Sequence, residues 1–160
     1  MTTYLHIIAR TYHVLIDTRS IREVLDSDTV GDGQVNEWHL WRDAAIQTRD
    51  LRRMLGELSP LPHRGALVYA EQDQVQPLIL LCDGVLGLVR AEDTDFCDVP
   101  RNAGAVAGFV DRIMPDSSGN QLLFRLRKGI WNTGHQTMPD MRCSGNHCPH
   151  SSNTPISVDN

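Results

Sequence analysis

The hydrophobic pattern is most pronounced in residues 78–89 (LILLCDGVLGLV), an apolar run that Asp83 and Gly84 interrupt. The run is too short to span a bilayer, which takes about 20 apolar residues. Its branched side chains and its glycines are unfavourable in a helix. It therefore predicts buried β-structure, in which the Asp-Gly pair marks a turn or a bend.

Short runs of β-branched, aromatic and aliphatic residues predict strands along the rest of the chain. Polar or glycine-bearing segments separate these runs, as is usual between short strands. The predicted strands are residues 4–8, 11–16, 66–70, 108–114 and 121–127, with a further strand within residues 38–46. Many short strands and few helices indicate an all-β fold of small barrels rather than an α/β sheet.

One or two short helices accompany the predicted strands. Ile21, Val24 and Leu25 have the i, i+3, i+4 spacing of a helix face, which favours a short helix over an extended edge in residues 18–25. Thr48 is a suitable N-cap for a second helix over residues 49–55. That helix would present one apolar face, formed by Leu51, Met54, Leu55 and Leu58.

The best internal boundary is the segment 59–65 (SPLPHRG), which holds two prolines and a glycine. We expect one domain over residues 1–128, with one subdomain over about 1–60 and another over about 61–128. From residue 129 onward the sequence is rich in Ser, Asn, Pro and Gly and has no hydrophobic period. Residues 129–160 are therefore predicted to form a disordered tail.

The charge balance restricts the classes of partner. Among 160 residues there are 15 Lys and Arg and 20 Asp and Glu, a formal net charge of −5, and no dense basic block. Nucleic acid requires a clustered positive surface, so we expect no such partner. The N-terminus lacks the pattern of a secretory signal, and no apolar run is long enough to cross a membrane. We therefore expect a cytoplasmic protein with reduced cysteines and no direct membrane insertion.

Two segments superficially resemble metal sites. In residues 26–37 an EF-hand register that begins at Asp26 places Val30, which has no side-chain oxygen, at the fifth position. Cys143, His147 and Cys148 lie close together in the tail, in a spacing that matches no standard zinc motif. A solvated loop and an incidental group of ligands are the favoured interpretations, so no metal site is expected.

Sequence motifs of catalysis and of nucleotide binding are missing. The chain has no G-x-S-x-G elbow, no P-loop and no G-x-G-x-x-G segment after a strand. This pattern favours a non-catalytic binding module without a cofactor.

Two charged residues lie among apolar neighbours. Arg42 follows Trp41 and precedes an apolar stretch, and Glu23 lies between Ile21 and Val24. They are either unrelated surface charges or an ion pair. An exposed pair would contribute only about 0–1 kcal/mol to stability, so its part in recognition would be orientation and specificity.

Four segments, in the same order along about 125 residues, resemble motifs of the CheW-like family of chemotaxis coupling proteins. Each motif is mostly an apolar pattern, and the order of the four makes the resemblance specific. The segments are 4–17 followed by 21–25 (IREVL), then 42–51 (RDAAIQTRDL), then 78–89, and finally 106–111 followed by 122–126.

The resemblance implies two intertwined, five-stranded, SH3-like β-barrels around a shared core, and no catalysis. It implies an adaptor at membrane-associated receptor arrays. That adaptor couples the regulatory domain of a CheA-type histidine kinase to the cytoplasmic tip of chemoreceptors.

The resemblance also suggests roles for single residues. Glu23 and Arg42 match the positions of a charged pair at the binding surface, with Ile21 and Val24 as an apolar rim beside them. Asp83, like Asp50, matches a position that fixes turns and backbone contacts.

The sequence departs from the family pattern in the second motif. Asp43 stands where the family has glycine, and Gln47 stands where it has proline. Two alternatives therefore stay open beside the adaptor: a kinase-binding regulator that does not couple to receptors, and a small metal-responsive protein that uses the Cys/His tail.

Overall fold

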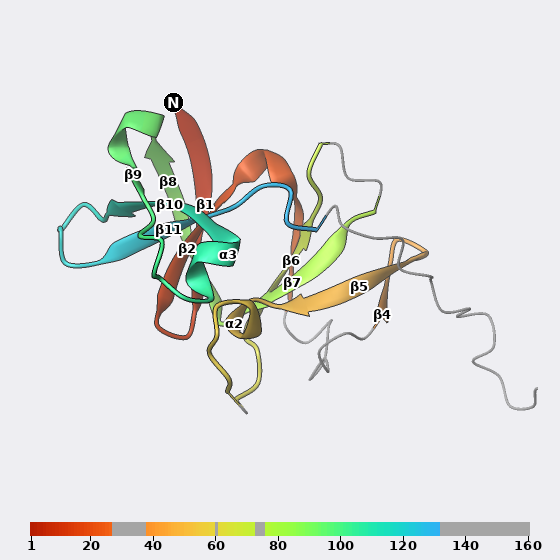
Figure 1. Cartoon of the computed structure of the whole chain (residues 1–160). Helices are drawn as coiled ribbons and strands as arrows, with labels where there is room; N and C mark the ends of the chain where they lie inside the picture. The colour runs from red at the N-terminus through yellow and green to blue at the C-terminus, as the bar shows by residue number, and fades with distance from the viewer. Residues whose placement is uncertain (27–37, 60, 73–75, 132–160) are drawn as a thin grey trace, which may run out of the picture.

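Eleven strands in two sheets make up most of the described chain, which comprises residues 1–26, 38–59, 61–72 and 76–131 of a computed structural model. The larger sheet has the order β8-β1-β2-β11-β10-β9 and lies on the left of Figure 1. Its strands are β1 (Thr2–Ala9), β2 (Tyr12–Asp17), β8 (Gly84–Ala91), β9 (Cys97–Asp98), β10 (Val110–Pro115) and β11 (Leu122–Leu126).

The smaller sheet has the order β3-β6-β7-β5-β4, so β3 and β4 are its two edges. Its strands are β3 (Ile21–Leu25), β4 (Trp38–Trp41), β5 (Ala44–Asp50), β6 (Gly65–Tyr69) and β7 (Leu78–Cys82). Two short α-helices, α2 (Leu51–Met54) and α3 (Val106–Phe109), and two 3₁₀ turns, Thr18–Ser20 and Asp93–Asp95, complete the described elements. The expected all-β class with one or two short helices is confirmed, although the sheets have six and five strands rather than five each.

The apolar run 78–89 crosses from one sheet to the other. β7 pairs with β5 and β6 in the smaller sheet, whereas β8 pairs with β1 in the larger one. Asp83 lies between them, and its backbone N–H donates to the carbonyl of Ile8 at 2.8 Å. The Asp-Gly pair is thus a bend between sheets and not a hairpin turn. β7 is buried throughout, but most of β8 is exposed, so the prediction of burial was right only for the first half of the run.

Both sheets combine strands from either side of the segment 59–65. β1 and β2 pair with β8 and β11, and β5 pairs with β7. The division between the sheets therefore does not coincide with a division of the chain near residue 60. The chain passes from the larger sheet to the smaller one after β2 and returns at Asp83 (Figure 1).

One local prediction was wrong and another was incomplete. Residues 21–25 form β3 and not a helix, because their backbone pairs with β6 and β-branched side chains suit an extended strand. Residues 38–46 hold a hairpin of β4 and β5 rather than one strand. Its turn consists of Arg42 and Asp43, both in the left-handed region with φ of 48° and 64°.

The helix predicted over residues 49–55 is shorter and begins with another cap. α2 starts at Leu51, and the side chain of Asp50, not Thr48, accepts the backbone N–H of Arg52 at 2.9 Å. Gly56 follows with a φ of 82°, a conformation that glycine adopts without steric cost. As predicted, Leu51, Met54 and Leu55 face the core, but Leu58 lies beyond the helix and is 76% exposed, so it is not part of this face.

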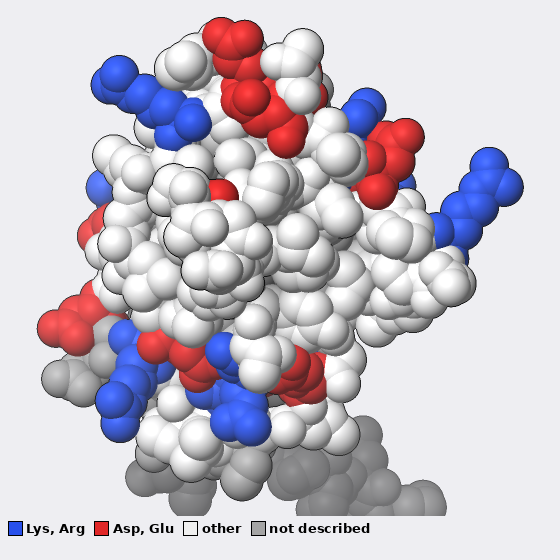
Figure 2. All heavy atoms as spheres, turned by 90° about the vertical axis from the view of Figure 1, so that its left-hand side faces the viewer, with Lys and Arg blue, Asp and Glu red and all other residues white. Residues whose placement is uncertain are grey.

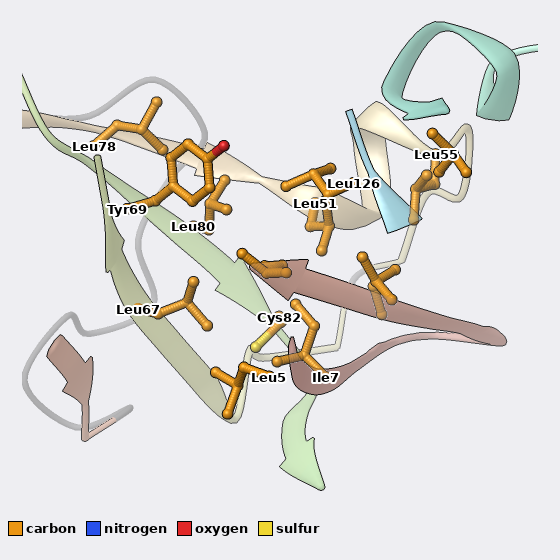
Figure 3. Close-up of a cluster of buried hydrophobic side chains, with 14 of the residues drawn as sticks. Leu5, Ile7, Leu51, Leu55, Leu67, Tyr69, Leu78, Leu80, Cys82 and Leu126 are labelled. Carbon is orange, nitrogen blue, oxygen red and sulfur yellow. The ribbon is translucent and has the colours of Figure 1, made fainter. Parts of the chain in front are cut away.

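The central hydrophobic cluster lies between the two sheets (Figure 3). It combines side chains of β1, β2 and β11 with side chains of β6, β7 and α2, including Leu5, Ile7, Leu126, Leu67, Tyr69, Leu80 and Leu51. A second cluster, around Tyr4 and Leu15, belongs to the larger sheet, and a third, around Val68 and Ile79, belongs to the smaller one. Each sheet is therefore buried on two faces, which is typical of barrels packed against each other.

The folded domain extends beyond residue 128, where the disordered tail was predicted to begin. Ile130 and Trp131 pack against the central cluster, so the first residues after 128 are part of the folded domain. Residues 132–160, with the Cys/His group, lie outside the described residues, as do residues 27–37 of the acidic loop.

Candidate partner-binding surface

The hairpin turn between β4 and β5 places Arg42 at the edge of the smaller sheet. Trp41 and Ala44 pair across the turn, which leaves Arg42 and Asp43 as its two central residues. Both have positive φ, as a two-residue hairpin turn of this twist requires. Asp43, where glycine was expected, therefore occupies a left-handed position that glycine adopts freely and Asp tolerates better than most residues.

Glu23, Trp41 and Arg42 form what we call the edge cluster. The Trp41 Nε1–H donates to Glu23 Oε2 at 2.9 Å, and Arg42 Nη2 lies 3.4 Å from the same oxygen. The Arg42 guanidinium carbon also lies 4.7 Å from the centre of the Trp41 ring. The structure thus brings together Glu23 and Arg42, which the sequence proposed as a pair, and adds an aromatic ring that connects them.

The edge cluster is exposed, and this decides its energetic role. The side chain of Arg42 is 71% exposed and that of Glu23 is 40% exposed. Solvent screens such an ion pair, which contributes about 0–1 kcal/mol. The hydrogen bond from the half-buried Trp41 is the more structural of the two contacts, and the guanidinium is left accessible to another molecule.

Ile21 and Val24 lie on the other face of β3. A β-bulge between Ile21 and Glu23 places Ile21 opposite Tyr69 and Val24 opposite Leu67, both residues of the central cluster. Glu23 lies opposite Val68, which belongs to the third cluster. The expected apolar rim beside the charged pair is therefore not formed, because the bulge turns Ile21 and Val24 away from Glu23.

Exposed aliphatic side chains border the central cluster on two edge strands. On β3, Val24 is 50% exposed. On β8, Leu88 is 68% exposed and lies opposite the buried Leu5 of β1. Val85 lies opposite Ile7 in the same way. The sequence did not single out Leu88, because the whole run 78–89 was interpreted as buried.

A buried polar network fixes the bend from which β8 starts. The Arg52 side chain is 1% exposed and forms a bidentate ion pair with Asp83. Its other donors reach the carbonyls of Leu61 at 2.6 Å and Pro62 at 3.1 Å. The backbone N–H of Arg10 also donates to Asp83, at 2.5 Å. The structural role expected of Asp83 is confirmed.

Electrostatics in this network favour the charged forms. Burial alone would raise the pKa of Asp83, but hydrogen bonds from Arg52 and from the backbone of Arg10 outweigh it and lower that pKa. The hydrogen bond to Asp83 raises the pKa of Arg52 in turn. The adjacent Cys82 is buried, which raises the pKa of its thiol to about 12. At neutral pH this cysteine is a thiol and a poor nucleophile.

The surface of the larger sheet carries few charges at its centre. Figure 2 shows a broad area without Lys, Arg, Asp or Glu, with side chains of both signs above and below it. This face has no continuous positive surface of the kind that phosphate binding needs. Among the described residues, no three His, Cys, Asp or Glu side chains are placed to hold a metal ion. No helix in the described ranges is long and apolar enough to cross a membrane.

Comparison with known proteins identifies the fold. No family model and no curated protein matches the sequence. The structure is similar to the crystal structure of the scaffolding protein TtCheW from Thermoanaerobacter tengcongensis, with a TM-score of 0.64 and 12% sequence identity. The match covers 79% of this chain and 88% of that chain. The chain therefore has the CheW-like fold, as the order of its sequence motifs suggested.

Proposed function

We propose that this protein is a non-catalytic adaptor of chemotaxis signal transduction, which couples a CheA-type histidine kinase to the cytoplasmic tips of chemoreceptors. The observation that carries the proposal is the CheW-like fold, shared with a scaffolding protein over most of both chains. The edge cluster and the exposed aliphatic residues of β3 and β8 give this scaffold surfaces for protein partners. The proposal places the adaptor in the cytoplasm, at membrane-associated receptor arrays.

The two faces of β3 suggest how one small domain serves two partners. Glu23, in the edge cluster, lies on one face of β3, whereas Val24 lies on the other face, at the margin of the central cluster. A partner held by the exposed guanidinium of Arg42 approaches from a different side than one that covers Val24 and Leu88. Kinase and receptor therefore need not compete for the same residues, as bridging requires.

Each surface suits a different kind of contact. An exposed Arg stacked near an indole is a polar anchor that gives specificity through orientation. Exposed aliphatic side chains on two strands that border the same buried cluster suit the apolar stripe of an amphipathic helix, such as a receptor helical hairpin presents. We assign the edge cluster to the kinase and the Val24–Leu88 margin to the receptor.

The decisive experiment is simultaneous binding. The purified protein is mixed with the regulatory domain of a chemotaxis kinase and with receptor tip fragments, and ternary complexes are measured by analytical ultracentrifugation. Arg42→Asp should reduce kinase binding alone, and Leu88→Asp should reduce receptor binding alone. Arg101→Asp, which changes an exposed charge in the loop before α3, is the control. A complex with the kinase only would favour the regulator without receptor coupling.

A further inference from the structure

The chain that follows β11 crosses from the larger sheet to the smaller one, and we call residues 128–131 the strap (Figure 1). Lys128 Nζ lies 3.0 Å from Asp17 Oδ2. The backbone N–H of Gly129 donates to both carboxylate oxygens of Glu71, at 2.8 and 2.9 Å. The ring of Trp131 packs edge-on against Tyr69, with 4.8 Å between ring centres and 70° between ring planes.

The groups that receive the strap are held in place by other parts of the fold. Asp17 is buried and forms a bidentate contact with the Arg19 guanidinium, which fixes its carboxylate without Lys128. Tyr69 is buried on β6, and its hydroxyl donates to Glu71 at 2.5 Å. Asp17, Tyr69 and Glu71 therefore form a preorganised site for a short peptide segment, which we call the strap site.

The strap itself is attached at the surface. The side chain of Lys128 is 60% exposed, and Trp131 is only partly buried. No residue of the strap belongs to a strand or an α-helix. Such a segment is expected to detach at far lower cost than the sheets that hold it.

We propose that the strap is an internal ligand, which occupies a peptide-docking site formed by Asp17, Tyr69 and Glu71 and is displaced by a partner segment of the same chemistry. That chemistry is a basic residue, a glycine next to it, and an aromatic ring two positions later. Each feature has its own receiving group: the Asp17 carboxylate, the Glu71 carboxylate, and the Tyr69 ring.

The glycine requirement follows from the backbone of the strap. Gly129 has a φ of 82°, in the left-handed region that other residues rarely adopt. This bend presents the Gly129 N–H to Glu71 and still allows the ring two residues later to reach Tyr69. A partner segment without glycine at this position would bind less well.

Displacement would alter the surface next to a proposed partner contact. Ile21 is the cross-strand neighbour of Tyr69 on the same face, so Trp131 and Ile21 flank one aromatic residue. Release of the strap would uncover this part of the central cluster. In this respect the inference rests on the proposed function, because it makes the strap a competitor of the receptor, whose proposed contact Val24 lies on the same face of β3 as Ile21.

Binding of a labelled peptide LRKGIW, which copies residues 126–131, tests the strap site in the absence of kinase and receptor. With full-length Trp131→Ala, fluorescence anisotropy should give at least tenfold tighter binding than with the wild-type chain, because the internal ring no longer competes. Changing the peptide's Trp to Ala, or its Gly to Val, should weaken binding at least tenfold. Lys128→Glu, which leaves Trp131 in place, should give an intermediate gain, and Arg101→Glu should give none.

Equal affinity of the wild-type chain and both strap variants for the peptide, or no binding at millimolar peptide, would overturn the strap site. Affinity for kinase or receptor is then measured with the same variants. A gain for Trp131→Ala would support the competition. Failure of every variant to bind kinase or receptor would count against the proposed function and leave the peptide result as it stands.

Discussion

Glu23 accepts the indole N–H of Trp41 at 2.9 Å, and this hydrogen bond joins the two edge strands of the smaller sheet. Glu23 lies on β3 and Trp41 on β4, which are the first and last strands in the sheet order. No backbone ladder links these edges among the described strands. A side-chain contact therefore closes the smaller sheet toward a barrel, next to the proposed kinase surface.

The stability of the smaller sheet should depend on Glu23 more than on Arg42. Glu23→Ala leaves the half-buried Trp41 N–H without its acceptor and should lower the free energy of unfolding by about 1–2 kcal/mol. Arg42→Ala removes only an exposed ion pair and should lower it by less than about 1 kcal/mol. Urea denaturation measures both values. A larger loss for Arg42→Ala than for Glu23→Ala would contradict the assignment.

The affinity for the kinase, unlike the stability of the smaller sheet, should depend strongly on Arg42. Arg42→Asp is expected to weaken the complex with the kinase regulatory domain by about 1–3 kcal/mol if Arg42 is a central contact. The melting temperature should change little, because the Arg42 side chain is mostly exposed. Isothermal titration calorimetry and thermal unfolding separate the two effects. Unchanged affinity would make Arg42 an ordinary surface charge.

The fold class could be predicted because hydrophobic runs and strand propensity are local properties. The sheet to which each strand belongs could not, since it depends on partners far away in the sequence. Residues 78–89 were recognised as β-structure, but the contact of Asp83 with Arg52, 31 residues earlier, helps to divide the run between two sheets. Exposure of Leu88 follows from the position of β8 at an edge.

The spacing of Ile21 and Val24 shows why a helix was predicted where a strand forms. Residues i and i+3 share a face in a helix, and they also share a face in a strand when a bulge adds one residue between them. The bulge in β3 does this. The sequence therefore predicted the pairing of Glu23 with Arg42, but not the part of Trp41 or Leu88, nor which face each side chain of β3 occupies.

The ion pair between Arg52 and Asp83 should be a major determinant of stability. Arg52→Ala removes the counter-ion of Asp83 and the donor to two backbone carbonyls. Asp83→Ala leaves the buried guanidinium of Arg52 without a counter-ion. Each change should cost about 3–5 kcal/mol. The double variant should lose clearly less free energy of unfolding than the sum of the two single losses, because the two residues belong to one network. Additive losses in urea denaturation would mean that the two side chains act independently.

The contact between His6 and His13 should make the larger sheet sensitive to mild acid. His6 Nε2 and His13 Nδ1 are 2.9 Å apart, which is a hydrogen bond only while one of the two nitrogens lacks a proton. Burial, together with the nearby His13, lowers the pKa of His6 below its ordinary value of 6.5, and Asp116 opposes this only in part. The folded state therefore binds protons less readily than the unfolded state. The contribution of His6 to the free energy of unfolding should be fully present above about pH 7.5 and should decrease as the pH falls through 6.5.

Denaturation curves between pH 8 and pH 5 measure this decrease. The slope of the free energy of unfolding against pH should stay below the value that the uptake of one proton on unfolding would give. His6→Gln should flatten the profile in this range, and His39→Gln, which changes a histidine on β4 of the other sheet, should leave it as in the wild type. The pKa of Asp83 is lowered from 3.8. Its contribution to the free energy of unfolding is therefore lost only below the pH range in which His6 titrates. A profile that stays sloped between pH 7 and pH 5 in His6→Gln would assign the acid sensitivity to another group.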